Sequence, residues 1–165
     1  MINRPAPPTM DPARREALLR GLDTQLQRHA AQVFRYVLDA EPYIPPGDDF
    51  FLETWRRLAP LGDDHVQLLT AAIELLGGLP GPAHLDPTLA DLNYLHVRFL
   101  NRKLMTYVRD TVAMSERNLE LAEGIDRLVA ILQTINEDSR EILAQLEALD
   151  RVAPQPPPAR LKAQG

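Results

Sequence analysis

The sequence predicts an all-α protein built as a four-helix bundle. Its 15 prolines are concentrated near the two ends and between Pro42 and Pro87, while residues 88–153 contain none. Proline removes a backbone donor and clashes inside a helix, so this distribution marks rigid connectors between long helices. Apolar residues recur at helical spacing in the segments between the connectors, and no alternating β pattern competes with them. Four long amphipathic helices of this kind pack as a bundle.

The first helix is expected over residues 12–40. Asp11 is placed to cap the free N–H groups of the first turn, and Pro12 stands where a missing donor does no harm. The helix is expected to stop at Glu41-Pro42. Its apolar positions form one stripe, which His29 interrupts: Leu19, Leu22, Leu26, Val33, Tyr36, Val37 and Ala40.

The second helical region covers residues 49–76 and contains Pro60 and Gly62. One interpretation is a single helix that is kinked at Pro60. The other is a short helix followed by a restart at Asp64, because Gln67 three residues later completes a capping-box pattern. In both cases the helix is expected to end at Gly77-Gly78.

The connector over residues 78–87 is long for an antiparallel turn, so the chain is expected to cross the bundle before the third helix. Asp86-Pro87 repeats the Asp-Pro helix start, and Gly124 is expected to separate the third helix from the fourth. The fourth helix has the most regular apolar stripe, in which Ser139 is the one polar member: Ile125, Leu128, Leu132, Ile135, Ile142, Leu146 and Leu149.

Length and composition limit the possible functions. The 165 residues suit one domain, expected over residues 11–152, with mobile proline-rich tails over residues 1–10 and 153–165. The absence of cysteine excludes disulfides, thiolate metal sites and a cysteine nucleophile. A net charge of −5 without a basic stripe argues against a nucleic-acid partner. No segment resembles a signal peptide or is long enough to span a membrane, so a cytoplasmic location is expected.

Three stretches of sequence together suggest a family. They are Leu22-Asp23-x-x-Leu26-x-x-His29 with Tyr36 seven residues later, HVQLLTAAIELLGGLPGP over residues 65–82, and EDSREILAQLEAL over residues 137–149. This pattern resembles the ferritin-like superfamily, especially the relatives of bacterioferritin and rubrerythrin. The resemblance covers roughly residues 16–150. It implies a four-helix bundle with a long crossover connection between the second and third helices.

The resemblance also implies the position of a metal site. These families carry a Glu in the first helix, Glu-x-x-His in the second and fourth helices, and a Glu in the third helix. Matched by interval, these positions fall on His29, Gly62, His65, Met105, Asp138 and Glu141. The candidate metal ligands are therefore His29, His65, Asp138 and Glu141.

The matched positions indicate that the centre for two metals is degenerate. Gly62 and Met105 offer no ligand of the usual kind, and two close metal ions need bridging carboxylates to neutralise them. Asp63 or Asp64 is a substitute for Gly62 if the Pro60 kink rotates the backbone. The residue after Gly62 is Asp63 instead of the haem-binding methionine of bacterioferritin, so haem is not expected.

Two interpretations of the polar cluster remain open. In the first, the four ligands hold a single transition metal, iron or manganese, and the resemblance implies iron handling or protection against oxidants. In the second, the imidazoles and carboxylates form a structural network, with Arg102 and Lys103 paired to Asp138 and Glu141 where a metal once sat. The protein is then a non-catalytic interaction module that presents a helix face or the Trp55 segment to a partner or to a second copy of itself.

Overall fold

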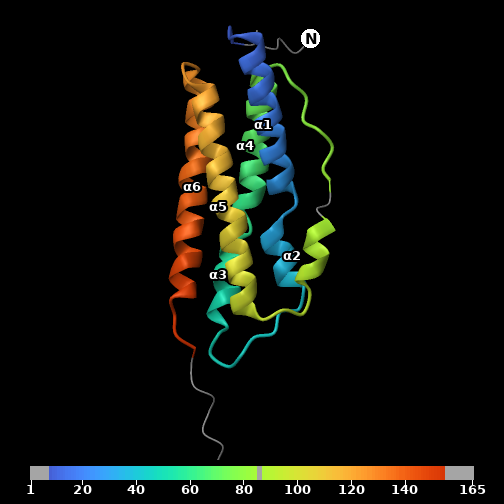
Figure 1. The fold of residues 1–165 in the computed structure, drawn as a ribbon, viewed down its shortest axis with the longest axis vertical. Coiled ribbons are helices and arrows are strands. Elements are labelled where there is room, and N and C mark those ends of the chain that lie inside the picture. The colour runs from blue at the N-terminus through green and yellow to red at the C-terminus, as the bar shows by residue number, and fades with distance from the viewer. Residues whose placement is uncertain (1–7, 85–86, 155–165) are drawn as a thin grey trace, which may run out of the picture.

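The computed structural model describes residues 8–84 and 87–154, and its helices line up as the four columns of a bundle (Figure 1). They are α1 (Pro12–Ala30), α2 (Val33–Asp39), α3 (Phe50–Leu58), α4 (Leu61–Leu75), the 3₁₀ helix η1 (Pro87–Leu92), α5 (Val97–Ala122) and α6 (Asp126–Asp150). The first column consists of α1 and α2, and the second of α3 and α4. Both α1 and α6 pack against α4 and α5. The predicted all-α four-helix bundle is confirmed.

Several helix ends lie where local chemistry predicts them. The Asp11 carboxylate accepts a 2.9 Å hydrogen bond from the backbone N–H of Arg14 at the start of α1. At the end of α4, Gly77 adopts a φ of 72°, and the N–H of Gly78 donates to the Ile73 carbonyl at 2.9 Å. This is the glycine-terminated ending expected for a helix. Gly124, with a φ of 83°, separates α5 from α6.

The long connection between α4 and α5 runs along the length of the bundle, as predicted (Figure 1). The first part of this crossover is fixed to α1. The backbone N–H of Gly81 donates to the Asp23 carboxylate at 2.8 Å, and the Gln27 amide donates to the Gly81 carbonyl at 3.3 Å. The crossover therefore brings the start of α5 to the end of the bundle opposite the end of α4. As a result, α4 and α5 point in the same direction.

The prediction of one unbroken first helix is wrong. The helix breaks at Ala31 and Gln32, and Gln32 adopts a left-handed backbone with a φ of 48°. Contacts across the bundle stabilise this break. The Gln32 amide donates to Asp63 of α4 at 2.9 Å and accepts from Arg35 at 2.9 Å, while Arg35 also forms an ion pair with Asp63. These tertiary bonds override the helical pattern of the sequence.

The third helix does not start at Asp86-Pro87. Asp86 lies outside the described residues, Pro87 begins the short η1, and α5 starts only at Val97. The backbone N–H of Tyr43 donates to the Leu95 carbonyl at 3.0 Å, and Val97 donates back to the Tyr43 carbonyl at 3.0 Å. This pairing holds the chain extended before α5. The His96 imidazole then caps α5 by accepting a 3.1 Å hydrogen bond from the N–H of Arg98.

The second column is closer to the kinked helix than to a restart at Asp64. Ala59 and Pro60 both keep right-handed helical angles between α3 and α4. Proline interrupts the hydrogen bonds at this point without reversing the chain. Helix α4 begins at Leu61, and among the described residues Asp64 forms no side-chain capping bond.

The described residues extend only slightly into the expected tails, so residues 1–7 and 155–165 lie outside them. Within the described part of the chain, no helix is both long and apolar enough to cross a membrane.

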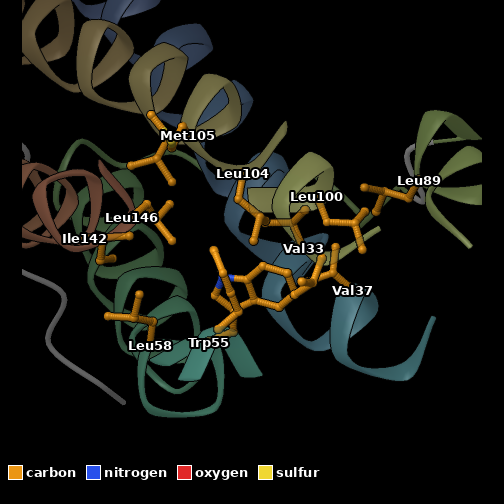
Figure 2. Packing of buried hydrophobic residues seen from close by; sticks show 13 residues of the cluster. Val33, Val37, Trp55, Leu58, Leu89, Leu100, Leu104, Met105, Ile142 and Leu146 are labelled. Carbon is orange, nitrogen blue, oxygen red and sulfur yellow. The ribbon is translucent and has the colours of Figure 1, made fainter. Parts of the chain in front are cut away.

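The buried apolar residues form two clusters, one in each half of the bundle. One cluster lies between α1, α4, the end of α5 and the first half of α6, and contains Leu18, Leu22, Leu26, Leu69, Ala72, Ile73, Leu76, Ala122, Leu128, Leu132 and Ile135. Figure 2 shows the other cluster, in which Trp55 lies among side chains of α2, α5 and α6. Trp55 is fully buried, so its own side chain does not form part of the surface.

A polar network in the first half of the bundle depends on Gly21. Gln25 donates to Ser115 at 3.1 Å and accepts from the Asn118 amide at 2.8 Å, and all three side chains are buried. A Cβ atom at Gly21 would lie 2.1 Å from the Asn118 side-chain oxygen. Glycine is therefore required at position 21 for α1 to approach this network.

We expect Gly21→Ala to lower the free energy of unfolding by about 2 kcal/mol, because Asn118 must shift and leave buried partners. Urea unfolding would measure the change. Gly62→Ala is the matched control, since the nearest atom to its new Cβ is 4.0 Å away, and it should be neutral or stabilising. An Asn118→Ala change added to Gly21→Ala should remove most of the clash. Equal effects of the two single glycine variants would contradict this account.

Candidate metal centre

A layer of polar residues separates the two apolar clusters. Each main helix contributes one member where its apolar stripe passes from one cluster to the other: His29 of α1, His65 of α4, Thr111 of α5 and Ser139 of α6. Thr111, Ser139 and His65 are at most 3% exposed. The polar positions noticed in the sequence therefore meet at the centre of the bundle.

His29, His65 and Asp138 form a chain of contacts in this layer. The His29 and His65 rings meet edge to face, with centroids 4.7 Å apart. The Nε2 atom of His65 lies 3.1 Å from the Asp138 carboxylate. An ionised carboxylate only accepts hydrogen bonds, so the Nε2–H of His65 donates to Asp138. In the neutral imidazole, Nδ1 then carries the lone pair. Asp138 thus orients His65.

Two imidazole nitrogens in this group of contacts have no hydrogen-bond partner among the described residues. Nε2 of His29 and Nδ1 of His65 are buried and form no hydrogen bond in the described part of the protein. Both residues line a cavity of about 40 Å³, which is large enough for a water molecule or an ion. A buried nitrogen without a partner is costly unless something occupies this space.

The pKa of His29 is lowered from 6.5 to about 3, chiefly by burial and also by the neighbouring His65 and the Arg28 guanidinium. His29 is therefore a neutral imidazole at physiological pH. Neutral imidazole is the form that binds metal ions.

Arg28 and Tyr107 close one side of the cavity. The Arg28 guanidinium lies 3.9 Å from the centre of the Tyr107 ring and donates to the Tyr107 carbonyl at 3.1 Å and to the Thr111 hydroxyl at 3.2 Å. The Tyr107 hydroxyl donates to the Arg28 carbonyl. This wall was not predicted from the sequence. The only feature of the sequence that pointed to this wall was Arg28, the residue before the candidate ligand His29.

The structure brings together three of the four predicted ligands. The fourth, Glu141, is exposed and accepts a hydrogen bond from Gln145 at 2.9 Å, so it lies outside the cluster. Asp138 pairs with His65 instead of Arg102 or Lys103, for which the described residues show no ion pair. Asp63, considered as a substitute for Gly62, is engaged by Gln32 and Arg35.

The donor set does not fit two metal ions. Of the positions matched to the family's other carboxylates, Gly62 lines the cavity without a side chain, and Met105 is buried in the apolar cluster. Within residues 8–84 and 87–154, no three His, Cys, Asp or Glu side chains are grouped to hold a metal ion. The unpartnered imidazole nitrogens belong to His29 and His65, which both line the cavity. This set suits at most one ion, completed by water.

Comparison with known proteins identifies the fold. No protein-family model matches the sequence, and no curated protein matches it. Among solved structures, the chain is similar to one from Bacillus anthracis str. Ames described as "ferritin like, diiron-carboxylate proteins". The two share 19% identity with a TM-score of 0.70, over 86% of this chain and 99% of the other. The expected ferritin-like bundle fold is confirmed.

Proposed function

We propose that this ferritin-like bundle binds a single transition metal ion between His29 and His65, in place of the two irons named for the similar Bacillus protein. The observation that carries the proposal is the pair of buried, unpartnered imidazole nitrogens at one cavity in the centre of the bundle. Imidazole donors suit iron, zinc and copper better than manganese. Among these metals we propose iron, because the similar Bacillus structure is described as diiron-carboxylate.

The roles of the three residues differ from those of a carboxylate-bridged centre. His29 and His65 would be the ligands, and Asp138 would position His65 through the 3.1 Å hydrogen bond to its other ring nitrogen. A carboxylate on the far side of a ligating histidine fixes the tautomer and makes the ligand more basic. A bound ion would supply a positive charge that satisfies both buried nitrogens.

The proposal predicts about one equivalent of ferrous iron per chain after anaerobic loading and desalting of protein without an affinity tag. We expect His65→Ala and His29→Leu to abolish retention, as measured by elemental analysis. His84→Ala is the matched control, because His84 is exposed on the crossover, and it should retain the metal. Wild-type protein that retains no iron, zinc or copper would overturn the proposal, as would equal losses in the His84 and His65 variants.

A separate prediction concerns Asp138. We expect Asp138→Asn to weaken metal affinity about 10- to 100-fold without abolishing binding, because the residue orients a ligand and does not itself ligate. Glu141→Gln should leave the affinity unchanged, since Glu141 is exposed. Competition with a chelator would measure both variants. Equal weakening by the two substitutions would contradict these assignments.

The second candidate function is a non-catalytic interaction module that pairs with a second copy. It is favoured by exposed aromatic side chains at the α3 end of the bundle, where Tyr43 is 62% exposed and Tyr94 is 74% exposed. Solution mass tests it. A dimer that dissociates on Tyr94→Ser, in protein that retains no metal, would support this function over the first.

A further inference from the structure

A second hollow lies beside the metal centre, between α2, η1 and α5, and Val33 and Tyr107 line both. It has a volume of about 470 Å³, within the range typical of small-molecule sites. Its floor is made of core residues, Val33, Val37, Leu89 and Leu104, each at most 6% exposed. Figure 2 shows Leu89 reaching from η1 toward Leu100 of α5 at the edge of the core. The hollow therefore opens from the surface onto the core.

One face of α5 forms the polar and aromatic side of this groove. Phe99, Lys103 and Tyr107 follow one another at intervals of four residues and all line the hollow. Phe99 is 42% exposed although it is a large apolar residue. The Lys103 ammonium lies 5.3 Å from the centre of the Phe99 ring. A cation and an aromatic ring thus stand together on the wall of an apolar groove.

The charges around the groove favour an anionic ligand. Lys103 is exposed and forms no ion pair among the described residues, so its ammonium is available to a ligand in the groove. Asp91 of η1 is the one carboxylate among the described residues that line the groove. An alkyl chain can fill the apolar floor while a negatively charged head pairs with Lys103.

We propose that this groove binds a single-chain amphiphile with an anionic head group, of the fatty-acid class. The alkyl chain lies over Val33, Val37, Leu89 and Leu104, and the carboxylate pairs with Lys103. The groove shares Val33 and Tyr107 with the metal cavity but includes neither His29 nor His65, so His65→Ala should leave amphiphile binding unchanged.

The experiment is titration calorimetry of the full chain with dodecanoate below its micelle concentration. We expect one site per chain, and a dissociation constant about tenfold higher for Lys103→Glu. Arg117→Glu is the matched control, because it makes the same charge change on an exposed part of α5 outside the groove. Asp91→Asn should tighten binding, since it removes the like charge.

Two further measurements test the proposal: a series of alkyl chain lengths and a cationic control. Affinity should rise about fourfold per added methylene from octanoate upward and then level off when the groove is full. Dodecylamine should bind more weakly than dodecanoate. The proposal is overturned if no dodecanoate binds, if the amine binds as tightly, or if the Lys103 and Arg117 variants weaken binding equally. A dimer that covers the groove and dissociates on Phe99→Ser, without dodecanoate binding, would also overturn it.

Discussion

Replacing Asp48 by Ala is expected to lower the free energy of unfolding by about 3–5 kcal/mol. Asp48 is 2% exposed and precedes α3, and its carboxylate accepts from Arg98 Nε at 2.8 Å and from Arg98 Nη2 at 2.6 Å. Removing the carboxylate leaves a largely buried guanidinium without its partner. That loss costs far more than an exposed ion pair contributes.

The position of Arg98 makes this pair important to the fold. Arg98 lies in the first turn of α5. Its guanidinium carbon lies over the Phe51 ring of α3, 5.2 Å from the ring centre, and its guanidinium donates to the Val152 carbonyl after α6. The pair therefore connects α3, α5 and the end of α6 at one end of the bundle. No sequence pattern indicated it, because Asp48 and Arg98 are 50 residues apart.

Chemical denaturation of Asp48→Ala and of a control would measure the effect. Glu147→Ala removes the partner of Arg109, and the side chains of that pair are 52% and 36% exposed, so we expect a loss below about 1 kcal/mol. Asp48→Leu combined with Arg98→Met should recover part of the stability, because neither charge then remains buried. Similar losses in the Asp48 and Glu147 single variants would show that the buried pair is not the cause.

The parts of the fold that follow from neighbouring residues could be predicted. Asp11 caps its own helix, and Gly77 and Gly124 adopt the positive φ angles that end helices. The break at Gln32 and the late start of α5 could not, because they depend on partners far along the chain. Asp63 stabilises the first and Tyr43 the second.

The candidate site was predicted in its positions but not in its roles. His29 and His65 lie together because each stands on the inward apolar stripe of its helix, and Asp138 reaches His65 from the border of the α6 stripe. Glu141 does not join them. The Asp138 side chain is already 39% exposed, at the edge of the inward face of α6. Three residues fall about 60° short of a full helical turn, so Glu141 points further toward solvent. Which nitrogen of His65 is free depends on its partner, which only the folded structure reveals.

The last prediction concerns the acid stability of the metal-free protein. The pKa of His29 is lowered from 6.5 to about 3, chiefly by burial. Between these values the unfolded chain binds a proton at His29 and the folded chain does not. Stability associated with His29 is therefore fully present above about pH 6.5 and is lost as the pH falls toward 3. At pH 4.5 the loss should reach roughly 2–3 kcal/mol.

His29→Leu isolates this effect, because leucine fills the apolar surroundings without a titrating group. We expect its free energy of unfolding, measured with a chelator present, to fall less than that of the wild type between pH 7 and 4.5. The difference between the two proteins cancels the carboxylates that both retain. Parallel pH profiles would mean that His29 accepts a proton in the folded bundle. That result would also weaken the proposed metal site, which requires a buried neutral imidazole at this position.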